Sequence, residues 1–221
     1  MSGAQAAIAE HAGERQGGRI VRYTLTERIN HWIGGFAYIY LLITGLAFWS
    51  PYLFWLAALA GGGPVARYWH PWVGLVFFAS MIWMLVDWRS DMATTPEDLK
   101  WRNDVQYYIR NEDEKLPPVG RFNWGQKQFF WVMVYAVVFL LLSGLAMWWV
   151  NDISWPYRWV RYLAVLIHDV AALVTIGAFI IHVYMGTAFV RGSFSAIVDG
   201  TVPEAWARTH HRLWYDKVTR K

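Results

Sequence analysis

Four long apolar stretches dominate the sequence, and they restrict the chain to one class of fold. They cover about residues 31–50, 70–88, 127–150 and 160–190. A helix needs about 20 apolar residues to cross about 30 Å of hydrocarbon, and each stretch is close to that length or longer. Inside a bilayer the backbone N–H and C=O groups must bond within the helix itself. The pattern therefore predicts an all-α integral membrane protein, a bundle of four transmembrane helices.

A fifth apolar stretch, YLFWLAALA at 52–60, is too short to span. We expect it to be interfacial or re-entrant. The predicted organisation is an N-terminal tail (1–28), of which the first 18 residues are expected to be mobile, a four-span domain (29–190) containing a loop (89–126), and a C-terminal tail (191–221).

Lysine and arginine indicate the orientation of the spans. Seventeen of the twenty lie before residue 30, within 89–127 or after residue 190. Connections on the cytoplasmic side carry an excess of these residues. We therefore expect both termini and the 89–126 loop to be cytoplasmic, in a multi-pass membrane protein. The net charge of +4 follows this topology and requires no nucleic-acid partner.

The chain contains no cysteine. Disulfides, thiolate-held iron–sulfur clusters and covalently attached c-type haem are therefore excluded. Any redox cofactor must be non-covalent and held by histidine, methionine or a similar ligand.

Four histidines fall in or beside the spans, at two depths. His31 begins the first, outward-running span, and His182 lies near the end of the fourth, inward-running span, so both are expected near the cytoplasm. His70 and His168 lie early in the two inward-running spans, near the outside. The depths therefore pair His70 with His168 and His31 with His182.

His168 and His182 are fourteen residues apart, which is about 21 Å and close to four helical turns, so both face the same side of the fourth span. Two imidazoles facing each other across a bundle suit the two axial positions of a haem iron. Hydrogen bonding between helices and a metal-ion transport path are the alternatives. Asp169, beside His168, is expected either to orient that ligand or to face a polar pocket.

An internal repeat supports the outer pair. Residues 41–49 (LLITGLAFW) resemble residues 140–148 (LLLSGLAMW), 99 positions later. A shift of 98 places His70 on His168. The spacing indicates two helical hairpins of common origin, but it does not generate the inner pair.

Longer motifs cover nearly the whole chain from Arg22. They are ERINHW (27–32), RYWHPW (67–72), GRFNWGQK (120–127) and AWARTHHRLWY (205–215), together with the two histidines of the fourth span. With them the chain resembles the gamma subunit of respiratory formate dehydrogenase, a membrane cytochrome b556 with two haems. Cytochrome b subunits of membrane-bound hydrogenases share the bundle and are the alternative family.

The resemblance implies the same ligand pairs and adds a substrate site. His70 and His168 would hold an outer haem b, and His31 and His182 an inner one. A quinone, menaquinone or ubiquinone, would be reduced beside His182, at a pocket formed by Asn123, Gly125, Gln126 and His182.

Three segments also have a purely structural interpretation. Asn123 is a good helix N-cap, with Gln126 three residues on as in a capping box. The 89–119 segment is expected to be partly helical. The segment from Pro203 is expected to form a surface helix in which His210 and His211 ligate no haem.

The resemblance also implies a location in the bacterial inner membrane, and it implies partners. An iron–sulfur beta subunit would deliver electrons from a molybdenum- or tungsten-dependent alpha subunit that oxidises formate, and these heterotrimers can associate further. The chain itself would transfer electrons and reduce quinone, and would not oxidise formate alone. A haem-free, histidine-dependent metal transporter is the less favoured alternative.

Overall fold

A computed structural model describes residue 13 and residues 15–220 of the chain. Most of the segment predicted to be mobile, residues 1–12 and 14, lies outside the described residues. The chain divides into two compact units. Unit 1 comprises residues 1–29, 87–131 and 181–221, and unit 2 comprises residues 30–86 and 132–180.

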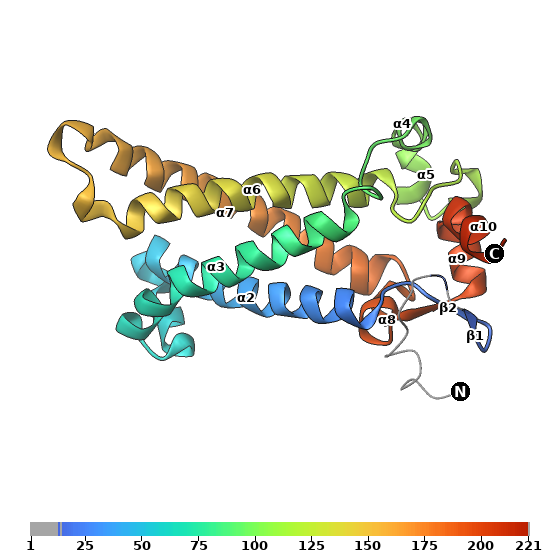
Figure 1. The fold of residues 1–221 in the computed structure, drawn as a ribbon, viewed down its shortest axis with the longest axis horizontal. Helices are drawn as coiled ribbons and strands as arrows, with labels where there is room; N and C mark the ends of the chain where they lie inside the picture. Colours follow the sequence, from blue (N-terminus) through green and yellow to red (C-terminus); the bar gives the residue numbers. More distant parts are fainter. Residues whose placement is uncertain (1–12, 14, 221) are drawn as a thin grey trace. The chain divides into compact units, whose positions relative to one another are not determined.

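Four long helices form the frame of the fold (Figure 1): α2 (Leu25–Trp49), α3 (Gly63–Trp88), α6 (Trp124–Trp148) and α7 (Trp159–Tyr184). All four are long and apolar enough to cross a membrane, which confirms the predicted spans. Helices α2, α3 and α6 begin three to seven residues before the corresponding apolar stretches, because the flanking polar and aromatic residues are also helical.

Short elements connect these helices. The 3₁₀ helix η1 (Pro51–Ala60) is the short apolar segment, and it ends at Gly61 with a positive φ of 87°. Its Ala57 packs with Ala47 and Ala66 in a small buried cluster. Two 3₁₀ turns, η3 (Val150–Asp152) and η4 (Trp155–Tyr157), precede α7, and a π-helical turn, η5 (Met185–Phe189), follows it.

Large apolar side chains cover the outside of unit 2. Leu142, Val170 and Ile180 are 60%, 52% and 62% exposed. In water such a surface would be unfavourable, whereas hydrocarbon solvates it without penalty. The outward faces of the helices are therefore suited to lipid.

Close helix packing inside unit 2 depends on small and polar residues. The side chain of Asn30 on α2 donates to the Ser80 carbonyl of α3 at 3.1 Å, and the Ser80 hydroxyl donates back to Asn30 Oδ1 at 2.8 Å. A Cβ added to Gly34 would lie 2.7 Å from Ser80 Oγ. Glycine at this position therefore permits the close approach that the paired hydrogen bonds require.

The loop between the second and third spans is partly helical, as predicted. It contains α4 (Pro96–Asn103), α5 (Val105–Ile109) and η2 (Asp113–Lys115). Lys127, at the start of α6, donates to Asp98 Oδ2 of α4 at 2.6 Å, and both side chains are almost fully buried. This pair ties the loop to the third span.

A small three-stranded antiparallel sheet joins the two ends of the chain within unit 1. It consists of β1 (Arg15–Gln16), β2 (Arg19–Val21) and β3 (Thr201–Pro203), in the order β1-β2-β3. The prediction of a mobile segment is therefore wrong for Arg15 and Gln16. The physical reason is burial: Ile20 and Val202 are fully buried in a cluster that anchors the strands.

Three short helices complete unit 1: α8 (Ser193–Val198), α9 (Glu204–His210) and α10 (Arg212–Thr219). The expected helix after Pro203 is present, but His211 is not on the surface, since it is 2% exposed. Its Nδ1 donates to the Gly120 carbonyl at 2.9 Å, and its Nε2 accepts from buried Arg22 at 3.2 Å. Four aromatic rings surround the Arg22 guanidinium within 5.6 Å of their centroids: Tyr23, Phe122, Trp206 and Trp214.

We expect His211 to make unit 1 less stable in acid. Burial and the Arg22 cation hold the pKa of His211 well below its usual range. Below about pH 6.5 the His211 imidazole is therefore protonated in the unfolded chain but stays neutral in the folded chain. Stability should fall by up to about 1.4 kcal/mol per pH unit as the pH drops below about 6.5. His211→Gln keeps an acceptor and a donor without titrating, so its thermal midpoint in detergent should vary less with pH. Equal pH dependence in the two proteins would contradict this assignment.

Candidate functional site

Unit 2 brings the predicted outer pair of histidines together. His70 lies on α3 and His168 on α7, and their ring centroids are 6.4 Å apart with a 53° angle between the rings. The two side chains come from different helices, as the depth argument predicts.

A threonine hydroxyl fixes the orientation of His70. Thr44 Oγ1 on α2 lies 2.8 Å from the Tyr40 carbonyl and 2.6 Å from His70 Nδ1. A hydroxyl has one hydrogen, and the carbonyl can only accept it. The hydroxyl oxygen therefore accepts from the Nδ1–H of His70, which leaves Nε2 unprotonated with a free lone pair.

The same arrangement occurs at His168. Ser143 Oγ on α6 donates to the Phe139 carbonyl at 2.6 Å and lies 3.0 Å from His168 Nδ1. The same reasoning leaves Nε2 of His168 as the free, electron-donating nitrogen. Both rings are thus in the tautomer whose Nε2 can bind a metal, and in each ring Nδ1 makes the second hydrogen bond that ligating histidines usually have.

A glycine follows each hydroxyl residue and leaves room for the ring. A Cβ on Gly144 would lie 3.3 Å from Cε1 of His168, and a Cβ on Gly45 would lie 3.8 Å from Cε1 of His70. A methyl group at Gly144 would therefore crowd the His168 ring, whereas one at Gly45 would make ordinary contact with the His70 ring.

The geometry fits a haem iron. Metal–imidazole nitrogen bonds are about 2 Å long, so two rings on opposite sides of one metal have centres about 6 Å apart. The observed 6.4 Å agrees. Within the described residues there is no cluster of three or more histidine and carboxylate side chains suited to a bare ion. A pair of imidazoles alone suits a metal that brings its own equatorial ligands, as haem does.

A packed layer lies between the two histidine levels of α7. Thr175 is seven residues from both His168 and His182. It is buried and bonds to the Tyr38 hydroxyl at 3.3 Å. The Tyr38 ring packs between Phe77, with centroids 5.5 Å apart, and Phe179, with centroids 4.8 Å apart. These contacts tie α2, α3 and α7 together within unit 2, seven residues beyond His168 along α7.

The predicted inner pair divides between the two units. His31 belongs to unit 2 and His182 to unit 1, so their pairing stays a prediction. Within unit 1, Phe129 of α6 stacks on His182 with centroids 4.7 Å apart and a 9° angle between the rings. This stacking orients the His182 ring.

The predicted quinone residues lie at the start of α6, in unit 1. Asn123 is 7% exposed, and its backbone N–H donates to Gln126 Oε1 at 3.0 Å while Gln126 N–H donates to Asn123 Oδ1 at 2.9 Å. The capping box is therefore confirmed. Asn123 Oδ1 and Gln126 Oε1 both accept hydrogen bonds in the capping box. The amide hydrogens of Asn123 are therefore available to other partners.

Comparison with known proteins identifies the family of the chain. Residues 22–200 match the family model described as prokaryotic cytochrome b561. The chain belongs to this cytochrome b family. Membership implies haem b, for which the His70–His168 pair provides suitable ligands.

Similar proteins include three formate dehydrogenase subunits. The chain is 37% identical to the cytochrome b556(fdo) subunit of Escherichia coli K12, over 91% of this chain and 94% of the relative. It is 31% identical to the cytochrome b556 subunit of Haemophilus influenzae, over 89% and 82%. It is 30% identical to the nitrate-inducible cytochrome b556(Fdn) subunit of E. coli K12, over 91% and 92%.

Sequence reasoning did not identify the hydroxyls that orient the histidines. It considered Asp169 for this role, whereas Ser143 contacts His168 Nδ1. The signal was present in the internal repeat, because Thr44 and Ser143 occupy equivalent positions 99 residues apart and each precedes a glycine.

We expect the substitution Gly144→Ala to weaken haem binding more than the substitution Gly45→Ala does. At Gly144 the new methyl group would force His168 to shift, and such overpacking costs about 1–3 kcal/mol. At Gly45 it would make ordinary contact with His70. Haem per protein, measured as the pyridine haemochrome after purification, should fall for Gly144→Ala and stay near wild type for Gly45→Ala. Equal haem content in both variants would show that this glycine does not shape the site.

Proposed function

We propose that the chain is the electron-transferring, quinone-reducing cytochrome b subunit of a formate dehydrogenase complex. When bound, an outer and an inner haem b supply one-electron carriers between an iron–sulfur partner and quinone. The observation that carries the proposal is the His70–His168 pair, 6.4 Å apart, with both Nδ1 atoms held by hydroxyls.

The second pair is argued from position along the helices. His182 follows His168 by fourteen residues on the unbroken helix α7, about 21 Å deeper. His31, in the first turns of α2, is the residue that topology places at the same depth. An imidazole within an apolar span is costly unless it serves a function. We assign His31 and His182 to the inner haem.

The quinone site would lie at the start of α6, beside His182. Asn123, Gly125 and Gln126 form this turn, and the Asn123 amide is the available donor toward a quinone carbonyl. A Cβ on Gly125 would lie 3.5 Å from Asn123 Oδ1 and 4.0 Å from Trp101, so Gly125 is next to the Asn123 side chain. Menaquinone and ubiquinone both present the carbonyl that this donor requires.

The partners and location follow from the relatives and the charge distribution. The relatives named above are formate dehydrogenase subunits, which favours formate over hydrogen as the electron source. We infer an iron–sulfur beta subunit and a molybdenum or tungsten alpha subunit as partners, in heterotrimers that associate further. The excess of Lys and Arg at both termini and in the 89–126 loop supports a cytoplasmic position for these segments in the bacterial inner membrane.

Double substitutions test the ligand pairs directly. His70→Ala and His168→Ala should each remove the outer haem, so combining them should cost no more haem than either alone. His31→Ala and His182→Ala should behave in the same way for the inner haem. Combining one change from each pair, as in His70→Ala with His31→Ala, should remove both. Haem per protein and the reduced-minus-oxidised spectrum measure the outcome. A His70→Ala/His182→Ala variant that retains one haem would refute the pairing.

Two substitutions at Asn123 separate its cap from its proposed substrate contact. Asn123→Asp keeps the oxygen that accepts from Gln126 N–H but removes the amide donor. Asn123→Ala removes both and should cost about 1 kcal/mol of stability. We expect both to raise the KM for quinone by up to about tenfold, the value of one hydrogen bond, with haem spectra unchanged. An Asn123→Asp variant with wild-type quinone kinetics would place the quinone elsewhere.

A further inference from the structure

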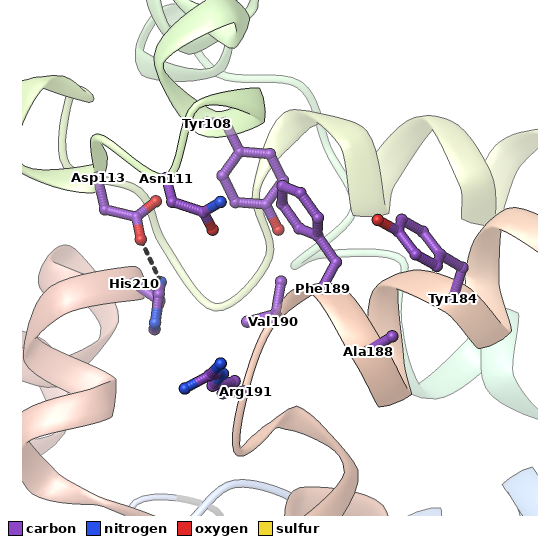
Figure 2. A pocket seen from close by; sticks show the side chains of 9 residues that line it. All are labelled: Tyr108, Asn111, Asp113, Tyr184, Ala188, Phe189, Val190, Arg191 and His210. Atoms are coloured by element: carbon purple, nitrogen blue, oxygen red, sulfur yellow. Dashed lines mark ion pairs between the residues drawn. The ribbon is translucent and has the colours of Figure 1, made fainter.

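Unit 1 contains a cavity of about 510 Å³ that the proposed electron path does not use. Its walls come from the connecting loop, from the end of the fourth span and from the C-terminal helices. Figure 2 shows Tyr108 and Asp113 from the loop, Tyr184 and Phe189 from the fourth span and its π-helical turn, and His210 from α9. A single π-helical turn of this kind often marks a functional site.

The polar groups of the cavity include an incompletely satisfied carboxylate. Asp113 Oδ2 lies 3.4 Å from His210 Nδ1, and the two side chains are about one-fifth exposed. Asp113 Oδ1 is buried and has no hydrogen-bond partner among the described residues. Buried carboxylate oxygens are almost always hydrogen-bonded to protein or water. A cavity of this volume has room for the water that this oxygen requires.

The cavity wall is continuous with the proposed quinone pocket through Tyr108. The Tyr108 side chain hydrogen-bonds to the side chain of Asn123. The Asn123 amide has two hydrogens, so one remains for a quinone after this bond. Tyr108 thus contacts the cavity on one side and the quinone residue on the other.

The charges around the cavity suit proton exchange better than anion binding. Arg191 lines the wall, and Arg22 and the neutral His211 lie close to His210. Burial lowers the pKa of His210, Asp113 opposes that shift, and Arg22 adds to it. Burial and Asp113 raise the pKa of Tyr108 to about 12, so its hydroxyl stays neutral and can both donate and accept. The Asp113 carboxylate in the wall disfavours a bound anion.

We propose that this cavity is the proton-entry vestibule of the quinone site, in which Asp113 and His210 pass protons from solvent to the Tyr108 hydroxyl and on to the pocket at Asn123. The inference rests on the proposed quinone reduction. Reduction of one quinone to quinol takes two electrons and two protons. The electrons arrive one at a time, and each proton comes from solvent water through the Asp113–His210 pair. In the reverse direction, quinol releases two protons by the same route.

Quinol-driven haem reduction in the purified, haem-loaded full chain tests the route without any partner subunit. Menadiol and decylubiquinol serve as donors, and reduction by dithionite reports haem integrity. We expect Asp113→Asn and His210→Gln to slow quinol-driven reduction about tenfold to hundredfold, the range of general acid–base contributions. The pH dependence of the rate should change as well, while dithionite reduces both haems fully. Glu114→Gln, an exposed carboxylate one residue on, is the matched control and should behave as wild type.

Rescue distinguishes proton transfer from a structural role. Acetate should restore part of the rate in Asp113→Ala, and the variants should show a larger solvent isotope effect than wild type. Wild-type rates and pH profiles in both Asp113→Asn and His210→Gln would overturn the proposal. A pH-independent loss without rescue would overturn it too, in favour of a structural role. If wild-type chain with intact haems is not reduced by quinol, the proposed function itself fails, and the vestibule fails with it.

Discussion

The hydrogen bond between a hydroxyl and an imidazole Nδ1 is the interaction on which the outer site depends. The hydroxyl groups of Thr44 and Ser143 each have one hydrogen, and each donates it to a backbone carbonyl of its own helix. Their oxygens can therefore only accept from His70 and His168, which leaves both Nε2 lone pairs free. The tautomers suited to a metal ligand therefore follow from hydrogen bonds that each hydroxyl makes to the backbone of its own apolar helix.

The hydroxyl–imidazole hydrogen bond occurs twice, once in each copy of the internal repeat. The Thr44–Gly45 and Ser143–Gly144 pairs occupy equivalent positions of the repeat, and the histidines they serve are offset by 98. Two hairpins of similar sequence can therefore each contribute one histidine and one orienting hydroxyl to the proposed outer site. His31 and His182 have no such relation, so the repeat accounts for the outer pair only.

The sequence predicts the spans and the outer pair because apolar length and helical depth are simple physical constraints. It did not predict the roles of Thr44 and Ser143, since a small hydroxyl residue in a span usually bonds only to its own helix. It also missed the buried position of His211. There, burial depends on Arg22, 189 residues away, and on aromatic residues whose convergence has no local signature. Contacts between distant segments are what local patterns cannot supply.

The two units differ in their content of titratable residues, and this difference matches the proposed transfer of electrons and protons. Unit 2 has few charged residues: Arg67, Asp152, Arg158, Arg161 and Asp169. All except Asp169, which lies inside α7, are in connections or near span ends. Electron transfer needs no titratable side chain, and an apolar, well-packed medium around Tyr38 and Thr175 excludes water. Quinone reduction consumes protons, which must reach the reacting oxygens through groups that exchange with solvent. Most of the carboxylates, together with His182, His210 and His211, accordingly lie in unit 1, which also contains the residues proposed to hold quinone.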